Sequence, residues 1–214
     1  MKPFQLEFIE YALANNVLRF GEFKLKSGRI SPYFFNSGLF NNGEHLSRLG
    51  DFYAKTINEH GIKFDTLFGP AYKGIPLVSA TAISLSNLYD RAVPYCFDRK
   101  EAKDHGEGGL TVGSPLQGNV LIVDDVITAG TSVRYSVDLI TKHEANPSGV
   151  IIALDRQEKG SGDISAVQEV EQSLGLSVTS IVTMENLIEY LSTNKSASNN
   201  LDAILAYKEK YGSD

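Results

Sequence analysis

The fold of this chain is decided by Val120-Leu121-Ile122-Val123-Asp124-Asp125-Val126-Ile127-Thr128-Ala129-Gly130-Thr131-Ser132. The first four residues are apolar and mostly β-branched, which predicts a strand buried on both faces, as in a parallel sheet. Two adjacent carboxylates follow where that strand should emerge, and then a short loop of small and hydroxyl residues. After the loop, Val133, Val137 and Ile140 recur at helical spacing, which indicates a helix with an inward face.

The loop between this strand and this helix is suited to hold a phosphate group. Its backbone N–H groups can converge, its hydroxyls can donate, and the start of the helix adds partial positive charge. Gly130 permits close backbone approach or a positive φ. Asp124 and Asp125 are unsuited to a phosphate because like charges repel, so sugar hydroxyls or a divalent cation are their expected partners. The alternative is an acidic turn cap followed by a loop of ordinary composition.

Size and composition indicate one soluble α/β domain over residues 1–214. The hydrophobic share of 42% and the charged share of 21% are those of an ordinary globular protein. A net charge of −6 argues against a nucleic-acid-binding surface. Neither a membrane span nor a signal segment is expected. The single Cys96 cannot form an internal disulfide, and a cytoplasmic location is expected.

Helical and strand patterns alternate along most of the chain. Strands are predicted at 66–68, 93–97, 120–123, 150–154 and 178–182, and helices at 46–57, 75–88, 133–140, 164–174 and 201–207. This alternation predicts βαβ units and a mostly parallel central sheet flanked by helices. A helix near 6–14 and a hairpin of strands 20–25 and 33–36 precede the alternation. They are expected to form a small N-terminal hood, residues 1–40, over one sheet edge.

The segment from Arg99 to Gly113 breaks this alternation. It has four glycines and no apolar periodicity, so we expect a long loop, and such loops in compact domains are functional or disordered. Three cationic side chains and one histidine lie in it, namely Arg99, Lys100, Lys103 and His105. The segment begins just after a predicted strand, on the side where α/β proteins bind ligands. The alternative is a solvated linker.

Three connections should therefore meet beyond the carboxyl ends of the strands. They are the loop Gly69–Gly74, the cationic segment from Arg99, and the acidic and hydroxyl stretch 124–132. The first loop can offer backbone N–H groups to a second phosphate, with Lys73 as a point charge. A ligand that touches all three would carry a monophosphate, a hydroxylated sugar and a further anionic group. The chain has no GxxxxGK[ST] or GxGxxG run, so it is not expected to be a P-loop or dinucleotide enzyme.

A second ligand needs a pocket of its own, and four residues are candidates for it. Phe34 and Phe35 end the hairpin, where one ring can stack on a planar heterocycle. Arg156 follows a strand end, and its planar fork can pair with a carboxylate. Lys26, at the hairpin turn, could point toward either ligand. Taken singly, the two aromatic rings are also consistent with core packing, and the two cations with surface charge.

The stretch 124–132 resembles the phosphoribosyl-pyrophosphate (PRPP) motif of type I phosphoribosyltransferases. Over almost its whole length the chain resembles the orotate phosphoribosyltransferases, with matching segments at 20–36, 69–76, 99–108 and 124–132. The hairpin and the lysine-rich segment are the parts most particular to the orotate enzymes. The resemblance implies a type I phosphoribosyltransferase fold and the transfer of ribose 5-phosphate from PRPP to N1 of orotate. The products would be orotidine 5′-monophosphate and pyrophosphate.

The resemblance also implies roles for individual residues. PRPP would be bound by Lys26, Tyr72, Lys73, Arg99, Lys100, Lys103, His105, Asp124, Asp125, Val126, Ile127, Thr128, Ala129, Gly130, Thr131 and Ser132. Orotate would be bound by Phe34, Phe35, Thr128 and Arg156. The catalytic group would comprise Lys73, Lys103, His105, Asp124 and Asp125.

The family further implies Mg²⁺ held mainly through PRPP and pyrophosphate, and no residue is predicted as a metal ligand of the protein's own. It implies a homodimer in which 99–113 is a mobile catalytic loop that completes the neighbouring subunit's site. Two alternatives stay open. One is a phosphoribosyltransferase for another base such as a purine, against which Arg156 argues. The other is a regulator of the same fold that binds PRPP without catalysis, against which the intact cationic segment argues.

Overall fold

The computed structural model describes residues 1–25, 27–103, 109–160, 162–194 and 198–213, and for Lys100, Ala102, Lys103 and Ser198 it describes only the backbone. The helices are α1 (Pro3–Ala14), α2 (Gly43–Glu59), α3 (Gly74–Tyr89), α4 (Thr131–Lys142), α5 (Ala166–Leu174), α6 (Met184–Thr193) and α7 (Leu201–Tyr211), with 3-10 turns η1 (Ser37–Leu39) and η2 (Ser198–Asn200). The strands are β1 (Leu18–Lys24), β2 (Ile30–Phe35), β3 (Thr66–Gly69), β4 (Tyr95–Lys103), β5 (Gly109–Gly113), β6 (Asn119–Val123), β7 (Asn146–Asp155) and β8 (Val178–Thr183).

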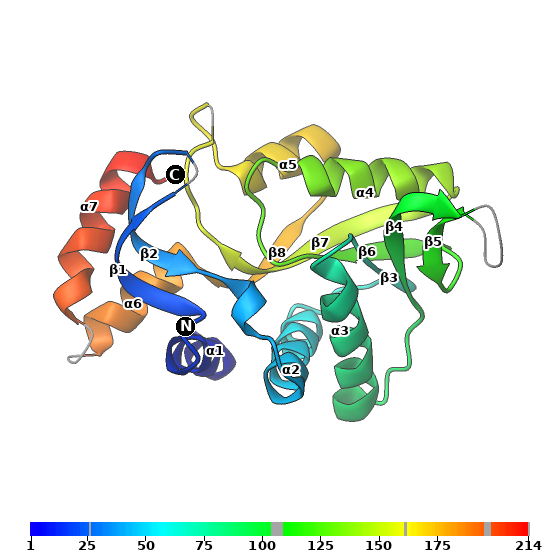
Figure 1. Cartoon of the computed structure of the whole chain (residues 1–214), viewed down its shortest axis with the longest axis horizontal. Coiled ribbons are helices and arrows are strands. Elements are labelled where there is room, and N and C mark those ends of the chain that lie inside the picture. Colours follow the sequence, from blue (N-terminus) through cyan, green and yellow to red (C-terminus); the bar gives the residue numbers. More distant parts are fainter. Residues whose placement is uncertain (26, 104–108, 161, 195–197, 214) are drawn as a thin grey trace.

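A central six-stranded sheet has the order β5-β4-β3-β6-β7-β8. All neighbouring strands in it are parallel except β4 and β5. Helices α2 and α3 cover one face, and α4 and α5 cover the other (Figure 1). The prediction of a mostly parallel sheet flanked by helices is therefore confirmed, with β6 in the interior of the sheet.

Strand β6 shows why this arrangement follows from its sequence. Leu121 and Val123 join the core on the α2 and α3 side, whereas Val120 and Ile122 join the core on the α4 and α5 side. All four side chains are buried. A strand with apolar residues on both faces requires cover on both, and the amphipathic helices before and after it supply that cover. In the described part of the chain, no helix combines the length and apolar character needed to cross a lipid bilayer.

The N-terminal segment forms α1 and a separate two-stranded antiparallel sheet of β1 and β2. The hairpin lies beside α7, at the end of the molecule away from β5 (Figure 1). Helix α1 packs on α6 and β8. Helix α6 was absent from the prediction because it follows β8 with no intervening loop: Thr183 is both the last residue of β8 and the N-cap of α6.

The expectation that 99–113 is a loop was wrong at both of its ends. Strand β4 continues to Lys103, and β5 returns antiparallel to it, with Asp98 opposite Thr111 and Lys103 opposite Gly109. A hairpin satisfies its backbone hydrogen bonds within itself, so it needs no buried apolar face and shows no apolar periodicity. Residues 104–108 between the strands lie outside the described residues.

Candidate functional site

Two of the three predicted connections meet at the carboxylate of Asp125. Its Oδ2 accepts a hydrogen bond from Lys73 Nζ at 2.6 Å, which brings the loop after β3 to the end of β6. The same oxygen accepts a second hydrogen bond from Ser37 Oγ at 2.5 Å. Ser37 begins the 3-10 turn that follows the hairpin. Asp125 therefore joins the β3 loop, the end of β6 and the N-terminal hood.

The two carboxylates point in different directions because the alternation of β6 continues through them. Asp125 faces Lys73 and Ser37, whereas Asp124 interacts with the Ser132 hydroxyl at the start of α4. Tyr53, fully buried on α2, donates a hydrogen bond from its hydroxyl to the Asp124 carbonyl at 2.7 Å. A hydrogen bond from α2 thus fixes the backbone at Asp124, while the side chains of Asp124 and Asp125 lie at the end of β6.

Burial raises the pKa of Asp124 from its ordinary value of 3.8 to about 6, and the negative charge of Asp125 adds to this shift. Hydrogen bonds from the Asp125 N–H and the Ser132 hydroxyl, together with the Lys73 charge, act in the opposite direction. A raised pKa means that ionised Asp124 costs the folded state free energy. Such a cost is typical of functional sites, where a charge is kept for a ligand.

We expect the pKa of Asp124 to govern the acid limb of activity. Below about pH 6 the protonated carboxyl loses its negative charge, so kcat/KM for a phosphorylated sugar should fall as pH decreases. Asp125→Asn should move this limb to lower pH, because the neighbouring negative charge is removed. The measurement is a pH profile of both proteins on the same substrate, so that titration of the substrate's phosphates cancels. Equal inflection points in the two profiles would contradict this assignment.

The hydroxyl loop after the acidic pair encloses a small cavity of about 260 Å³. It is lined by Asp124, Val126, Ile127, Thr128, Ala129, Gly130, Thr131, Ser132 and Val133. Gly130 has φ +67° at the N-cap of α4, and a Cβ there would lie 2.9 Å from a Val170 methyl carbon. The positive φ and the short distance to Val170 both require glycine at this position. The cavity is small, is lined by hydroxyl groups and lies at the N-terminus of α4, and these properties suit a phosphate.

The loop Gly69–Gly74 differs in one respect from the expectation of free backbone donors. The Ala71 N–H donates to the Asp98 carboxylate, and the Gly74 N–H donates to the Pro70 carbonyl at 2.9 Å. These two N–H groups are engaged within the protein. The loop can still present the side chains of Tyr72 and Lys73, both of which are exposed.

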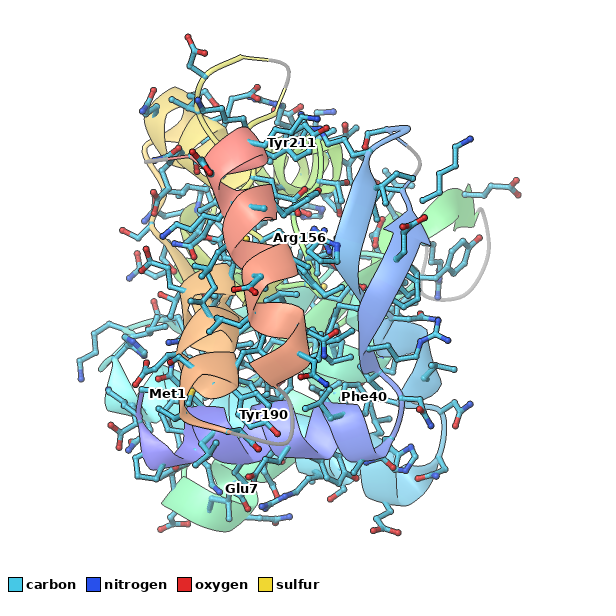
Figure 2. The ribbon with its side chains drawn as sticks, turned by 90° about the vertical axis from the view of Figure 1, so that its left-hand side faces the viewer. Met1, Glu7, Phe40, Arg156, Tyr190 and Tyr211 are labelled. Atoms are coloured by element: carbon cyan, nitrogen blue, oxygen red, sulfur yellow. The ribbon has the colours of Figure 1, made fainter. Side chains whose placement is uncertain are left out.

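Arg156 lies under the hairpin rather than on the surface. Its Nη2 pairs with Glu158 Oε1 at 2.5 Å and donates to Ser31 Oγ at 3.0 Å, and its guanidinium lies 4.2 Å from the centre of the Tyr33 ring. Figure 2 shows Arg156 between α7 and the hairpin. The side chains of Arg156 and Glu158 are only 16% and 11% exposed. A guanidinium has five donors, and these polar contacts use one nitrogen.

The site also includes Ser31, Ser37, Glu158 and Tyr207, none of which was predicted from sequence. Tyr207 on α7 is buried, and both Glu158 and Arg156 perturb its pKa, which burial raises. The C-terminal helix therefore helps to enclose the arginine. No local sequence pattern identifies these residues as parts of the site, because each reaches the site through the packing of elements that are distant in sequence.

Phe34 and Phe35 point to opposite faces, as alternation predicts. Phe35 packs against the core, with its ring 6.3 Å from that of Phe8. Phe34 instead stacks on Phe23 at 5.6 Å, beside the Arg19 guanidinium. Phe34 is therefore the ring on the outer side of the hairpin, and Phe35 is the one that anchors it.

Several predicted residues cannot be placed. Lys26 and His105 lie outside the described residues, as do the side chains of Lys100 and Lys103. Arg99 lies on β4, immediately before these two lysines. The third predicted connection is consequently located only by the β4–β5 hairpin, which extends from the strand next to β3.

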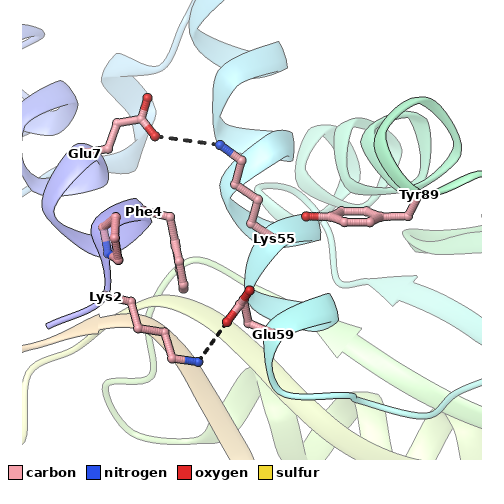
Figure 3. A pocket seen from close by; sticks show the side chains of 7 residues that line it. Lys2, Phe4, Glu7, Lys55, Glu59 and Tyr89 are labelled. Carbon is pink, nitrogen blue, oxygen red and sulfur yellow. Dashed lines mark hydrogen bonds and ion pairs between the residues drawn. The ribbon is translucent and has the colours of Figure 1, made fainter.

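A second cavity, of about 700 Å³, lies between α1, α2 and α3 (Figure 3). Lys2 pairs there with Glu59 at 3.1 Å, and Lys55 pairs with Glu7 at 3.7 Å. Its charges are thus matched within the protein, unlike the hydroxyl-lined cavity at the strand end. Within the described residues, no group of three or more His, Cys, Asp or Glu side chains is placed to hold a metal ion.

Comparison with known proteins gives this geometry a context. Residues 39–181 match the model of the phosphoribosyl transferase domain. Orotate phosphoribosyltransferases of Proteus mirabilis and Salmonella typhi are 59% and 58% identical to the chain over 212 residues, which cover 99% of this chain and 99% and 100% of theirs. The crystal structure of the Francisella tularensis orotate phosphoribosyltransferase superposes with a TM-score of 0.88 at 45% identity. It matches 97% of this chain and 100% of its own.

Proposed function

The chain belongs to the orotate phosphoribosyltransferase family and transfers ribose 5-phosphate from PRPP to N1 of orotate in pyrimidine biosynthesis, and we propose that it does so at the carboxyl ends of β3 and β6. The observation that carries this location is the junction at Asp125, where Lys73 and the hood residue Ser37 meet one carboxylate oxygen. In the proposed arrangement the 5′-phosphate occupies the cavity of residues 128–132. The ribose then lies over the acidic pair.

The acidic pair would act on the ribose. The bond from the anomeric carbon to pyrophosphate breaks ahead of formation of the bond to orotate N1, so the sugar acquires oxocarbenium character, as in glycoside hydrolysis. Pyrophosphate leaves with the bonding electron pair. Asp124 and Asp125 supply negative potential beside the positive ribose and orient its hydroxyls. The N1–H proton of orotate must leave as its bond to the ribose forms, and the oxygens of the departing pyrophosphate can accept it, so no separate general base is assigned to the protein.

The pyrophosphate would lie between the loop Gly69–Gly74 and the β4–β5 hairpin. Lys73 extends from the first of these, and Arg99, Lys100, Lys103 and His105 belong to the second. These cations would offset the charge that grows on the departing group. Mg²⁺ is part of the proposal, since this ion commonly binds through substrate phosphates, waters and one or two carboxylates. Asp124 and Asp125 are the described carboxylates suited to it, and the ion would supply further charge neutralisation.

The orotate carboxylate would pair with Arg156, whose guanidinium is buried and held rigidly by Ser31, Tyr33 and Glu158. A cation at this point favours a carboxylated pyrimidine over a purine. The test of the whole proposal is pyrophosphate release from PRPP and Mg²⁺ with a panel of bases. We expect release with orotate and none with adenine or hypoxanthine. Release with a purine, or with no base at all, would contradict the assigned pocket.

A homodimer is also part of the proposal. Large apolar side chains are exposed on α3 and on the β4–β5 hairpin, with Ile83 61% exposed and Leu88, Tyr95 and Leu110 each more than a third exposed. Surfaces of this kind are favoured positions for a second copy. In this arrangement the hairpin of one subunit would reach the neighbouring site. The expected cytoplasmic location stays a prediction.

Lys103→Ala tests whether the hairpin acts in catalysis. We expect kcat to fall about tenfold or more, the scale of one lost charged hydrogen bond, while orotate affinity is nearly retained. Mixing this variant with an Asp124→Asn, Asp125→Asn variant should restore part of the activity if the lysine acts on the neighbouring subunit. An unchanged kcat would remove the hairpin from catalysis. Absence of restoration would place its action within one subunit.

A further inference from the structure

Asp98 is a buried carboxylate beside the proposed pyrophosphate site. It lies on β4, is 1% exposed, and accepts a hydrogen bond from the Ala71 N–H through Oδ1. Its Oδ2 is buried without a hydrogen-bond partner among the described residues. A buried carboxylate is costly unless it is hydrogen-bonded or paired with a cation. The Ala71 N–H, from the loop after β3, supplies one hydrogen bond, and the Tyr135 side chain on α4 also interacts with this carboxylate.

The loop that Asp98 holds has little freedom at its two ends. A Cβ on Gly74 would lie 2.6 Å from the carbonyl carbon of Gly69, so the ends of the loop are in direct backbone contact. The Gly74 N–H also donates to the Pro70 carbonyl at 2.9 Å. With its ends closed in this way, the direction of the loop's tip depends on how Ala71 is held. Tyr72 and Lys73 are the next two residues along the chain.

A third element, α4, also meets Asp98. Tyr135, on the first turns of α4, has a pKa raised mainly by burial and further by the negative charge of Asp98 and by a side-chain hydrogen bond with it. The carboxylate is therefore placed between β4, the loop after β3, and α4. These are the elements that carry the cationic hairpin, Lys73 and the hydroxyl loop.

We propose that Asp98 is a positioning residue for PRPP, which fixes Ala71 so that Tyr72 and Lys73 project toward the pyrophosphate. This inference rests on the proposed function of the loop Gly69–Gly74. It assigns Asp98 no contact with substrate. We assign this effect to the hydrogen bond with the Ala71 N–H, for which an amide oxygen at the same place should serve nearly as well.

The test compares Asp98→Ala with Asp98→Asn. We expect Asp98→Ala to raise KM for PRPP about tenfold, the scale of one buried donor left unpaired, with KM for orotate within about twofold of wild type. Asp98→Asn should stay within about twofold of wild type for both substrates. Because Asp98→Ala could fold poorly, Asp98→Leu serves as a second variant that fills the space without an acceptor. A purely structural role would change both substrates together and would show no rescue by Asn.

Asp65→Ala is the matched control, because Asp65 accepts a backbone hydrogen bond from Asn119 at the opposite end of β3, at 2.7 Å. It should leave KM for PRPP unchanged. Calorimetric binding of pyrophosphate gives a readout without turnover, and it should weaken in Asp98→Ala alone. Normal pyrophosphate and PRPP binding in Asp98→Ala would overturn the inference while leaving the proposed function intact. Failure of the wild-type protein to release pyrophosphate would instead count against the function.

Discussion

Replacing Asp124 and Asp125 together with Asn is expected to lower kcat by about 100- to 1000-fold, the usual cost of a lost charge-stabilising group. Asparagine keeps the size of both side chains and one of the two acceptor oxygens of each. The change therefore removes negative charge from beneath the ribose with little loss of shape. The measurement is kcat at saturating PRPP and orotate, compared with Asp138→Asn, a control on the exposed face of α4. Activity near that of wild type would contradict the role given to the acidic pair.

The same variant should not lose stability, and this separates function from folding. The folded-state pKa of Asp124 is raised, so its protonation favours folding. The stabilising contribution is complete below pH 3.8 and is lost as pH rises through about 6. At pH 7 ionised Asp124 carries the cost of its burial and of repulsion from the Asp125 charge, and Asn removes both. We expect a Tm at pH 7 equal to or above that of wild type, whereas a large fall in Tm would mean that the loss of activity reflects unfolding.

Arg156→Ala is expected to abolish selective use of orotate and also to destabilise the protein. Loss of the proposed buried pair between Arg156 and the orotate carboxylate should cost about 2 kcal/mol or more, so kcat/KM for orotate should fall at least about 30-fold. KM for PRPP should change little, because the contacts of Arg156 are with the hairpin residues Ser31 and Tyr33 and with Glu158. The measurement is a full kinetic analysis with each substrate varied in turn. Equal losses for PRPP would show that Arg156 has been assigned to the wrong substrate.

The stability effect of Arg156→Ala has a separate cause. Glu158 pairs with Arg156 at 2.5 Å and is only 11% exposed, so truncation leaves this carboxylate with only the more distant Arg29, at 3.9 Å, as a cationic partner among the described residues. Such a loss typically costs about 3–5 kcal/mol. The double variant Arg156→Met, Glu158→Gln removes both charges and should recover most of the Tm while remaining defective with orotate. Recovery of orotate use in the double variant would mean that the single variant failed through misfolding.

Local pattern was sufficient for most of the central fold. The run 120–123 needs no tertiary information to be assigned as a doubly buried strand, since four apolar, mostly β-branched residues have few other uses. Sequence pattern did not predict the elements that depend on a neighbouring element for their stability or for their start. Strands β4 and β5 stabilise each other across a hairpin with few apolar residues, and α6 is joined to β8 without the break that usually marks a helix start.

The sequence by itself determined the parallel sheet, the acidic pair and the hydroxyl loop, because all of these follow from residues adjacent in the chain. Only the tertiary structure decided that one oxygen of Asp125 meets both Lys73 and Ser37, and that Asp98 holds Ala71. It likewise decided that Arg156 is paired with Glu158 beneath the hairpin and beside α7. Hydrogen bonds and ion pairs act over a few ångströms in space, so partners tens of residues apart become neighbours only when the sheet brings the ends of its strands together.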